Sequence, residues 1–245
     1  MSQLEVIQPD WNAPDTIYAC CTTRSGGVSQ RGYSSLNLAS HVADDLVNVQ
    51  CNRVLLQQHL KLPTEPQWLN QTHTTEVTNL DYDSSRDTDA AITSIPSRIA
   101  VVLTADCLPV LFTNIQGTEV GAAHAGWRGL LNGVLENTLQ ALTSPAEEII
   151  AWLGPAIGPQ RFEVGQEVRL AFTHQDAQLD KFFIPTRSGH YLADLYSIAR
   201  TRLKNIGLRH ISGGQYCTFN EADRFFSYRR EKDTGRQASL IYIKQ

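Results

Sequence analysis

Two short segments in the middle of the chain carry the residue types best suited to chemistry. Cys107 lies in TADCLPVLF, residues 104–112, and His124 lies in GAAHAGWRG, residues 121–129. Each stands near the expected carboxyl end of a buried strand, which is the edge where α/β proteins tend to bind ligands. A thiolate and an imidazole placed there could bind zinc, or they could act as nucleophile and general base. Their separation of 17 residues matches no recognised metal spacing, so two buried core residues remain an alternative.

Polar residues beside these segments could complete a site. Asp106 directly precedes Cys107 and could orient a ligand or carry a proton, although a lone acid is more often a turn or cap residue. Arg128 falls in the first turn of the helix expected after His124, where a cation suits an anion such as phosphate. A solvated surface arginine is the alternative. Trp127 could stack on a nucleobase, although tryptophans more often pack in a core.

Further candidates stand on weaker grounds. His73, in NQTHTTEV, lies among polar residues typical of a loop and could be a third ligand. Arg24 stands next to a turn-forming SGG sequence and could bind an anion. Taken alone, both are more often plain surface residues. The pair of arginines at 229 and 230, in FFSYRREKDTGR, is expected to be an exposed hairpin charge run.

Several familiar catalytic signatures are absent from the sequence. It contains no P-loop pattern G-x-x-x-x-G-K-[ST], no G-x-G-x-x-G, no nucleophile elbow G-x-S-x-G and no H-E-x-x-H. The zinc deaminase pattern, H-x-E with P-C-x-x-C, is missing as well. The common nucleotide-binding, hydrolase and zinc-protease classes therefore lose their usual support.

The elements that must position these residues alternate between strand-like and helix-like periodicity. Acidic residues at 44 and 45 could cap a helix reaching position 61, and Asp194 could cap another that stops at Gly207. The spacing of apolar residues predicts a further helix over 131–142. Buried strands are expected over 17–23, 99–105, 109–113, 118–123, 148–153 and 238–243.

Packing and domain organisation follow from the same patterns. Cys20 and Cys21 are neighbours on an expected strand, so their side chains should point to opposite faces. With no repeat and no convincing linker, we expect one domain over residues 1–245, of α/β class with mixed α+β character. The helix that begins near residue 44 should bury an apolar stripe made of Val47, Cys51, Val54, Leu55 and Leu60.

Composition and charge exclude several classes of partner. The 245-residue chain has 21 Lys and Arg against 25 Asp and Glu, a formal net charge of -4. This balance argues against a protein built around non-specific binding to nucleic acid or to anionic membranes. Apolar runs such as residues 99–103 are far shorter than the ~20 residues that cross a bilayer. Five cysteines without a C-x-x-C pair, and an N-terminus without a secretion signal, favour a cytoplasmic location.

The central motifs resemble those of the laccase-domain family, which is also described as multicopper polyphenol oxidase-like, as purine nucleoside phosphorylase and as peptidoglycan editing factor. The resemblance rests on TADC, HAGWRG and GPAIGP, the last at residues 154–159. It extends through TTRSGGVSQRGYSSLNLASHVADD (22–45), DLYSIARTRLKNIG (194–207) and FFSYRREKDTGRQASLIYI (225–243), and so covers nearly the whole chain. It implies a single-domain layered sandwich of mixed β-sheets flanked by helices.

The resemblance also implies a metal site and an activity. By position, the zinc ligands of the family fall on His73, Cys107 and His124, which would leave a fourth coordination position open, as in catalytic zinc sites. The implied reaction is phosphorolysis of purine nucleosides, adenosine and inosine, with methylthioadenosine as a further candidate. Deamination of adenosine accompanies it, and the editing-factor description links the family to the fidelity of cell-wall peptidoglycan precursors.

The expected division of roles follows from this implied activity. Purine nucleoside and phosphate would be the small-molecule partners, and nothing in the sequence selects a monomer or a weak homodimer. The expected catalytic residues are Cys107, His124 and Asp106, and the expected substrate-binding residues are Arg24, Asn37 and Arg128.

Other functions stay open from the sequence. Cys107 as nucleophile and His124 as base would make a hydrolase or amidase of peptide-like or cell-wall precursor substrates. A non-catalytic binding protein with a structural metal is another possibility. Copper is a less favoured cofactor than zinc, and a copper-dependent polyphenol oxidase is poorly supported. Multicopper centres need many histidines, whereas this chain has seven, spread singly, and one methionine.

Overall fold

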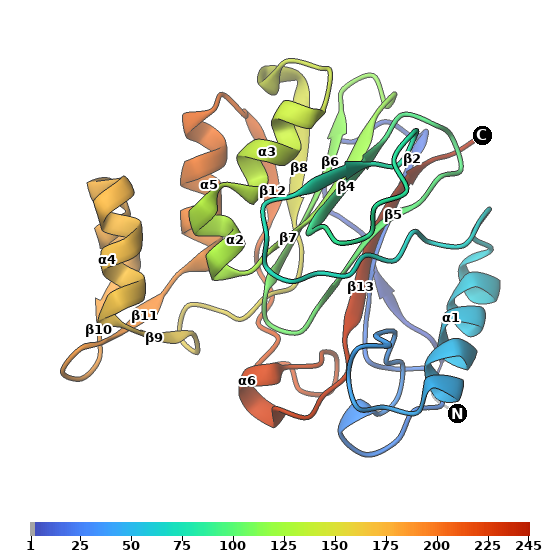
Figure 1. Cartoon of the computed structure of the whole chain (residues 1–245), viewed down its shortest axis with the longest axis horizontal. Helices are drawn as coiled ribbons and strands as arrows, with labels where there is room; N and C mark the ends of the chain where they lie inside the picture. The colour runs from blue at the N-terminus through green and yellow to red at the C-terminus, as the bar shows by residue number, and fades with distance from the viewer. Residues whose placement is uncertain (1–2) are drawn as a thin grey trace.

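The computed structural model describes residues 3–245 and places two β-sheets face to face at the centre of the protein (Figure 1). The four-stranded sheet is antiparallel, in the order β1-β2-β13-β5, whereas the six-stranded sheet, β12-β8-β6-β7-β4-β3, has a parallel pair at each end. The first sheet consists of β1 (Val6–Ile7), β2 (Ile17–Thr22), β13 (Gln237–Ile243) and β5 (Ala100–Thr104). The second consists of β12 (His210–Gly213), β8 (Ile149–Leu153), β6 (Leu108–Asn114), β7 (Val120–Ala125), β4 (Ala90–Thr93) and β3 (Val77–Asn79).

Helices cover the outer faces of both sheets (Figure 1). The outer face of the six-stranded sheet carries α2, α3 and α5, and the outer face of the four-stranded sheet carries α1. To one side, α4 packs on a small antiparallel sheet in the order β10-β11-β9. The helices are α1 (Leu46–Leu60), α2 (Trp127–Asn132), α3 (Val134–Ala141), α4 (Gln166–Gln175), α5 (Leu195–Asn205) and α6 (Tyr228–Glu231). The small strands are β9 (Glu163–Gly165), β10 (Phe183–Pro185) and β11 (His190–Ala193), and 3-10 turns span Arg31–Tyr33, Ala146–Glu148 and Ala177–Phe182.

Three apolar layers hold this stack together. Trp152 of the six-stranded sheet and Cys21 of the four-stranded sheet pack in the layer between the sheets. Leu135 of α3 packs on the other face of the six-stranded sheet, and Leu56 of α1 packs with Cys20 beyond the four-stranded sheet. The opposite orientations of Cys20 and Cys21 are therefore as predicted, and the predicted mixed α/β sandwich is confirmed.

Most element boundaries were predictable from local sequence. All six predicted strands are present, and their ends fall within two residues of the expected positions. Asp45 caps α1 by accepting a hydrogen bond from the backbone N–H of Val47 at 2.8 Å, and Asp194 caps α5 through the N–H of Ser197 at 3.0 Å. Side-chain caps of this kind satisfy backbone donors that a helix leaves unpaired, which is why acidic residues mark these starts.

The apolar stripe predicted for α1 is wrong. The helix instead turns Asn52 inwards, where its side chain donates to Ser29 Oγ at 2.9 Å and to the carbonyl oxygen of Asn37 at 2.8 Å. A search for apolar spacing passes over a buried polar residue of this kind, so it selects the wrong face. The buried residues of α1 are Val49, Asn52 and Leu56, whereas Val47, Cys51 and Val54 are exposed.

The single helix predicted over 131–142 is also wrong, because two helices occupy this region. Gly133 adopts a φ of +101°, a left-handed conformation that ends α2 and lets α3 begin in a new direction. The first of these helices starts at Trp127, directly after β7. The predicted position of Arg128 in a first helical turn is therefore confirmed.

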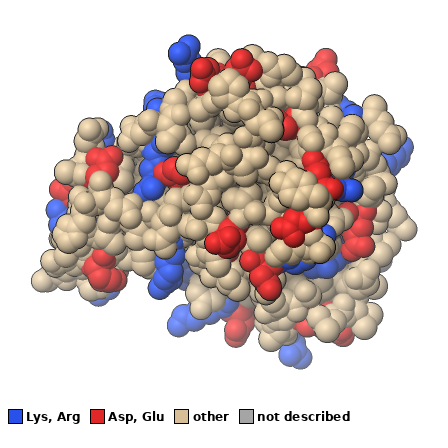
Figure 2. All heavy atoms as spheres, turned by 45° about the horizontal axis from the view of Figure 1, so that its top comes forward, with Lys and Arg blue, Asp and Glu red and all other residues tan. Residues whose placement is uncertain are grey.

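The surface carries both signs of charge. Acidic and basic side chains are interspersed over the face shown in Figure 2. Within residues 3–245, no helix is long and apolar enough to cross a membrane.

A buried carboxylate outside the candidate site offers a test of pH-dependent stability. Glu119 is 5% exposed and accepts hydrogen bonds from Thr143 N, Thr143 Oγ1 and Ser144 N, each at 2.8 Å. Burial raises the pKa of Glu119, but these hydrogen bonds lower it below the ordinary value of 4.5. The resulting stabilisation is therefore present above pH 4.5 and is lost as the pH falls through the lower folded-state pKa.

We expect Glu119→Gln to reduce the free energy of unfolding at pH 7 by about 1–3 kcal/mol. Urea unfolding at pH 7 and at a pH below the folded-state pKa of Glu119 measures the effect, which should shrink in acid as the wild-type carboxylate becomes protonated. An equal loss at both pH values would contradict the assigned role of the charge.

Candidate metal centre

The thiol of Cys107 lies where the chain crosses from one sheet to the other. β5 belongs to the four-stranded sheet and β6 to the six-stranded sheet, and residues 105–107 join them. Asp106 in this link has a φ of +88°, which is uncommon for a residue with a side chain. Its carboxylate accepts hydrogen bonds from Thr218 Oγ1 and from the backbone N–H of Arg229, both at 2.6 Å. Asp106 therefore fixes the turn that presents Cys107.

One buried carboxylate, that of Asp89, positions both candidate histidines. Asp89 directly precedes β4 and is 0% exposed, and its Oδ1 lies 2.6 Å from Nδ1 of His124 on the neighbouring β7. The backbone N–H groups of Thr72, His73 and Thr74 donate to the same carboxylate at 3.1, 3.1 and 2.6 Å. These contacts hold the His73 loop and leave Nε2 of His124 available for a ligand, as carboxylate–histidine pairs do at metal sites.

His73, Cys107 and His124 come together as expected. One ligand atom from each lies within 4.8 Å of the others, and Cys107 Sγ is 3.7 Å from His73 Nε2. Gly126 keeps this space open, because a Cβ there would lie 2.6 Å from His73 Cδ2 and 3.0 Å from Cys107 Sγ. Two imidazoles and a thiolate form a donor set suited to zinc or copper. The three side chains can therefore hold one metal ion with a coordination position left over.

The electrostatics of the cluster favour a thiolate. Burial would raise the pKa of Cys107, but His124 and His73 lower it to about 6. Burial would lower the pKa of His124, but Cys107 and Asp89 raise it to about 9. These shifts favour a Cys107 thiolate beside a protonated His124, whose proton a bound metal ion would displace.

A cavity of about 510 Å³ opens over these ligands. Trp127 and Phe162 contribute aromatic rings to its walls, and Arg128, Arg229 and Arg236 contribute cations. Its volume is in the usual range for small-molecule sites. The walls thus offer apolar ring faces to a flat ligand and positive charge to an anion.

Arg24 and Asn37 are not among the described residues that line this cavity. The guanidinium of Arg24 donates to the carbonyl oxygens of residues 34 and 222 and forms an ion pair with Glu231 at 3.0 Å. The side chain of Asn37 is fully buried, and its Oδ1 accepts from the backbone N–H of Arg236 at 3.0 Å. Both residues hold neighbouring segments in place, whereas Asp106 and Arg128 do line the cavity.

Sequence reasoning missed Asp89, Arg236 and His41, of which the last two line the cavity. An acid standing directly before the apolar run AAIT was an available signal for Asp89. No local pattern marks His41 or Arg236, because only the fold brings them to the ligands.

The exposed hairpin predicted around residues 229 and 230 is wrong, because these residues belong to the short helix α6. Arg230 donates to the carbonyl oxygens of residues 218, 219 and 225, so its side chain ties this segment to the body of the protein. Arg229 is exposed, as expected, and its side chain also lines the cavity.

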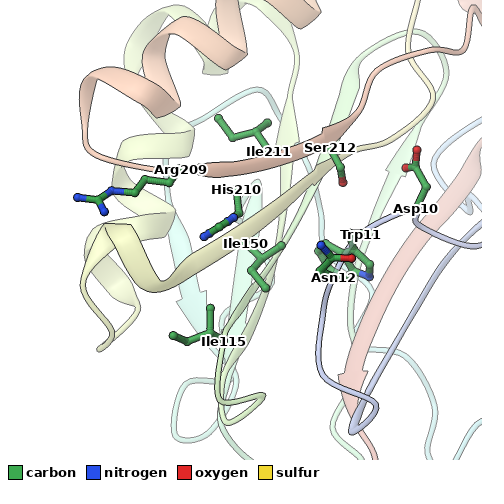
Figure 3. A pocket seen from close by; sticks show the side chains of 9 residues that line it. All are labelled: Asp10, Trp11, Asn12, Ile115, Ile150, Arg209, His210, Ile211 and Ser212. Carbon is green, nitrogen blue, oxygen red and sulfur yellow. The ribbon is translucent and has the colours of Figure 1, made fainter.

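A second cavity, of about 380 Å³, lies beside the edge strand β12 (Figure 3). Trp11, Ile150 and His210 are among its lining residues, and Arg209 points away from its centre. Among residues 3–245, the one His, Cys, Asp or Glu group compact enough for a metal is the trio at the first cavity. The first cavity is therefore the stronger candidate for catalysis.

The chain resembles known proteins over nearly its whole length. The chain is 49% identical over 244 residues to a purine nucleoside phosphorylase of Haemophilus influenzae, covering 98% of this chain and 100% of the relative. It is also 49% identical to the purine nucleoside phosphorylase YfiH of Escherichia coli, with 98% and 99% covered. The crystal structure of the Neisseria meningitidis protein NMB0706 superposes with a TM-score of 0.94 at 47% identity, covering 98% of this chain and 99% of that one.

The family assignment rests on nearly the full length of the chain. A family model described as multi-copper polyphenol oxidoreductase laccase matches residues 18–244. That range contains the three candidate ligands and every lining residue of the first cavity. The chain therefore belongs to the multi-copper polyphenol oxidoreductase laccase family.

Proposed function

We propose that this protein is a zinc-dependent purine nucleoside phosphorylase that also deaminates adenosine. One observation carries the proposal: His73, Cys107 and His124 converge beneath a cavity that combines aromatic rings with arginines. The names of the Haemophilus influenzae and Escherichia coli relatives support the phosphorylase part. The deaminase part is supported by the donor set, because a metal site with an open position suits attack of water on a purine ring.

The walls of the cavity match the two substrates of phosphorolysis. A purine base presents a flat face that can stack on Trp127 or Phe162, as nucleobases do on aromatic side chains. Phosphate carries negative charge that Arg128, Arg229 and Arg236 can neutralise through charge-assisted hydrogen bonds. Both substrates therefore have chemically suitable neighbours in one cavity.

The reaction joins a phosphate oxygen to C1′ of the ribose and breaks the bond from C1′ to N9 of the purine. The products are the free base and a pentose 1-phosphate, and the proton that the base gains can come from the attacking phosphate. The cavity arginines would hold the phosphate against C1′ and stabilise charge as it is redistributed. Zinc, when bound by the three ligands, supplies Lewis acidity at the floor of the cavity.

Zinc fits the donor set better than a copper cluster does. The described residues provide one group of three ligands, which accommodates one ion, whereas a multicopper centre needs several groups. The same His2Cys set could hold a single copper ion, so elemental analysis of the purified protein decides the identity of the metal.

The proposal predicts that cleavage of inosine requires inorganic phosphate and releases a pentose 1-phosphate, whereas deamination of adenosine requires only water. A chelator should stop both reactions together, and added zinc should restore them. Product analysis by chromatography, over a panel of adenosine, inosine and methylthioadenosine, measures each reaction. Cleavage at equal rates with and without phosphate would refute phosphorolysis.

A second candidate function is favoured by the chain of contacts from Asp89 through His124 to Cys107. Without a metal, a thiolate of pKa about 6 beside an imidazole oriented by a carboxylate resembles the nucleophile, base and orienting acid of cysteine hydrolases. Such an enzyme would cleave an amide in a peptide-like or cell-wall precursor. Treatment of zinc-loaded protein with iodoacetamide separates the two functions. A thiolate bound to zinc should be protected from alkylation, whereas rapid alkylation of Cys107 would favour the cysteine hydrolase.

A further inference from the structure

The guanidinium of Arg236 is held rigidly at the wall of the first cavity. Its Nη1 donates to the carbonyl oxygens of Thr234 at 2.8 Å and Gly235 at 2.9 Å, and Asn37 Oδ1 fixes its backbone N–H. Within residues 3–245, neither Nε nor Nη2 of Arg236 has a protein acceptor. The edge of a guanidinium formed by Nε and Nη2 is the one that binds two oxygens of an anion side by side.

The positive charge of Arg236 has no carboxylate partner. Of the described ion pairs, none involves Arg128, Arg229 or Arg236, whereas Arg24 is paired with Glu231. Burial lowers the pKa of Arg236, while Cys107 and Asp106, which line the same cavity, raise it.

The carboxylate of Asp106 is already engaged by Thr218 and by the backbone of Arg229. A half-buried cation with an unused hydrogen-bonding edge therefore lines the cavity without an ion-paired carboxylate.

The other cavity arginines are held differently. Arg229 uses Nη1 to donate to the carbonyl oxygen of Glu163 at 2.9 Å, and it is exposed. Arg128 is also exposed, with its guanidinium 4.3 Å from the centre of the Trp127 ring. Exposed arginines are screened by water and lose more side-chain freedom on binding, so they contribute less per contact. Arg236 is the most buried of the three.

We propose that Arg236 is the principal phosphate-binding residue, holding inorganic phosphate through Nε and Nη2, with Arg128 and Arg229 as weaker contacts at the rim. This inference rests on the proposed phosphorylase activity and replaces Arg24 in the role expected from the sequence. Arg24 is instead a positioning residue, because its ion pair with Glu231 anchors α6, the helix that carries Arg229.

The test compares Arg236→Gln and Arg236→Lys with a matched control, Arg209→Gln, in zinc-loaded protein. Arg209 is exposed and lies at the second cavity, away from the first, with its guanidinium pointing outwards (Figure 3). For Arg236→Gln we expect the KM for phosphate to rise about 10- to 100-fold, because a charge-assisted pair of hydrogen bonds is lost. The KM for inosine and the rate of adenosine deamination should stay within about 3-fold of wild type. The lysine variant should recover part of the phosphate affinity, because it restores the positive charge but cannot form the bidentate pair of hydrogen bonds.

Calorimetric titration with inorganic phosphate alone gives a readout that does not depend on turnover. Phosphate should bind to wild type and to Arg209→Gln, and binding should weaken about 10- to 100-fold in Arg236→Gln. An unchanged phosphate affinity in folded Arg236→Gln would overturn the inference. So would an equal loss of phosphate affinity, inosine affinity and deamination, which would assign Arg236 a structural role.

Failure of the proposed function would look different. If wild type cleaved inosine without phosphate, phosphorolysis would be refuted, while the calorimetric comparison would still decide whether Arg236 binds the anion. If Arg236→Gln did not fold, as judged by thermal unfolding, the folded Arg236→Lys variant would carry the test. Unaltered phosphate binding in Arg236→Lys would then count against the inference, because the side-by-side contact is lost in that variant.

Discussion

Replacing Cys107 with serine is expected to remove the metal and to lower phosphorolysis and deamination to about a thousandth of wild type or less. A serine hydroxyl stays protonated at neutral pH and is a poor zinc ligand, so two histidines alone would have to hold the ion. The fold should persist, because the three apolar layers are formed without Cys107. Elemental analysis, circular dichroism and thermal unfolding measure the metal and the fold separately.

Cys51→Ser is the matched control for this experiment. Cys51 is an exposed free thiol on α1 and lies outside the ligand group. The Cys51→Ser variant should keep the metal content and the turnover of wild type. Global unfolding of the Cys107 variant would assign the metal a structural role, and full turnover without metal would contradict the proposed site.

Replacing Asp89 with asparagine is expected to weaken metal binding by about 10- to 100-fold, the range found for partners that orient metal ligands. The effect should lie at the upper end of this range because Asp89 contacts His124 directly and also accepts from the loop that carries His73. An asparagine keeps one acceptor oxygen but loses the charge and presents an amide in place of the second oxygen. Competition with a chromogenic chelator measures the zinc affinity of each variant.

Asp81→Asn provides a control of similar chemistry, because the described partners of the Asp81 carboxylate are Thr93, Ser94 and Arg98 and include no histidine. Asp81 accepts hydrogen bonds from Thr93 Oγ1 at 2.5 Å and from Ser94 N at 2.9 Å, so its loss should also cost stability. Zinc affinity should nevertheless remain at the wild-type value. If both variants weakened zinc to the same extent, Asp89 would act through general stability and not through the histidines.

Local sequence patterns predicted the framework of this protein well, for identifiable physical reasons. The segment 99–103 is a continuous apolar run because both faces of its strand are covered. Asp194 stands at a helix start because it caps unpaired N–H groups. The errors arose where a polar side chain is buried or a glycine changes the chain direction. Asn52 faces inwards on α1, and Gly133 divides the predicted helix in two.

The site was only partly accessible from the sequence. The ligand trio was proposed from a resemblance that spans several motifs, and its convergence follows from the crossover at Cys107 and the pairing of β4 with β7. Arg24 adjoins a conspicuous turn and so stands out in the sequence, whereas no local pattern marks Arg236. Whether an arginine is already paired depends on a residue as distant as Glu231, and spacing along the chain carries no information about that contact.

Gly126 has a consequence for sorting related sequences of unknown activity. Because a single added methyl carbon at this position would overlap the ring of His73, a chain of this fold with a larger residue there should be unable to accept an ion unless the His73 loop moves. The presence of all three ligand residues would then be a misleading sign of a metalloenzyme. The residue at the position of Gly126, two after His124, can thus be used to separate related sequences that can bind the metal from those that cannot.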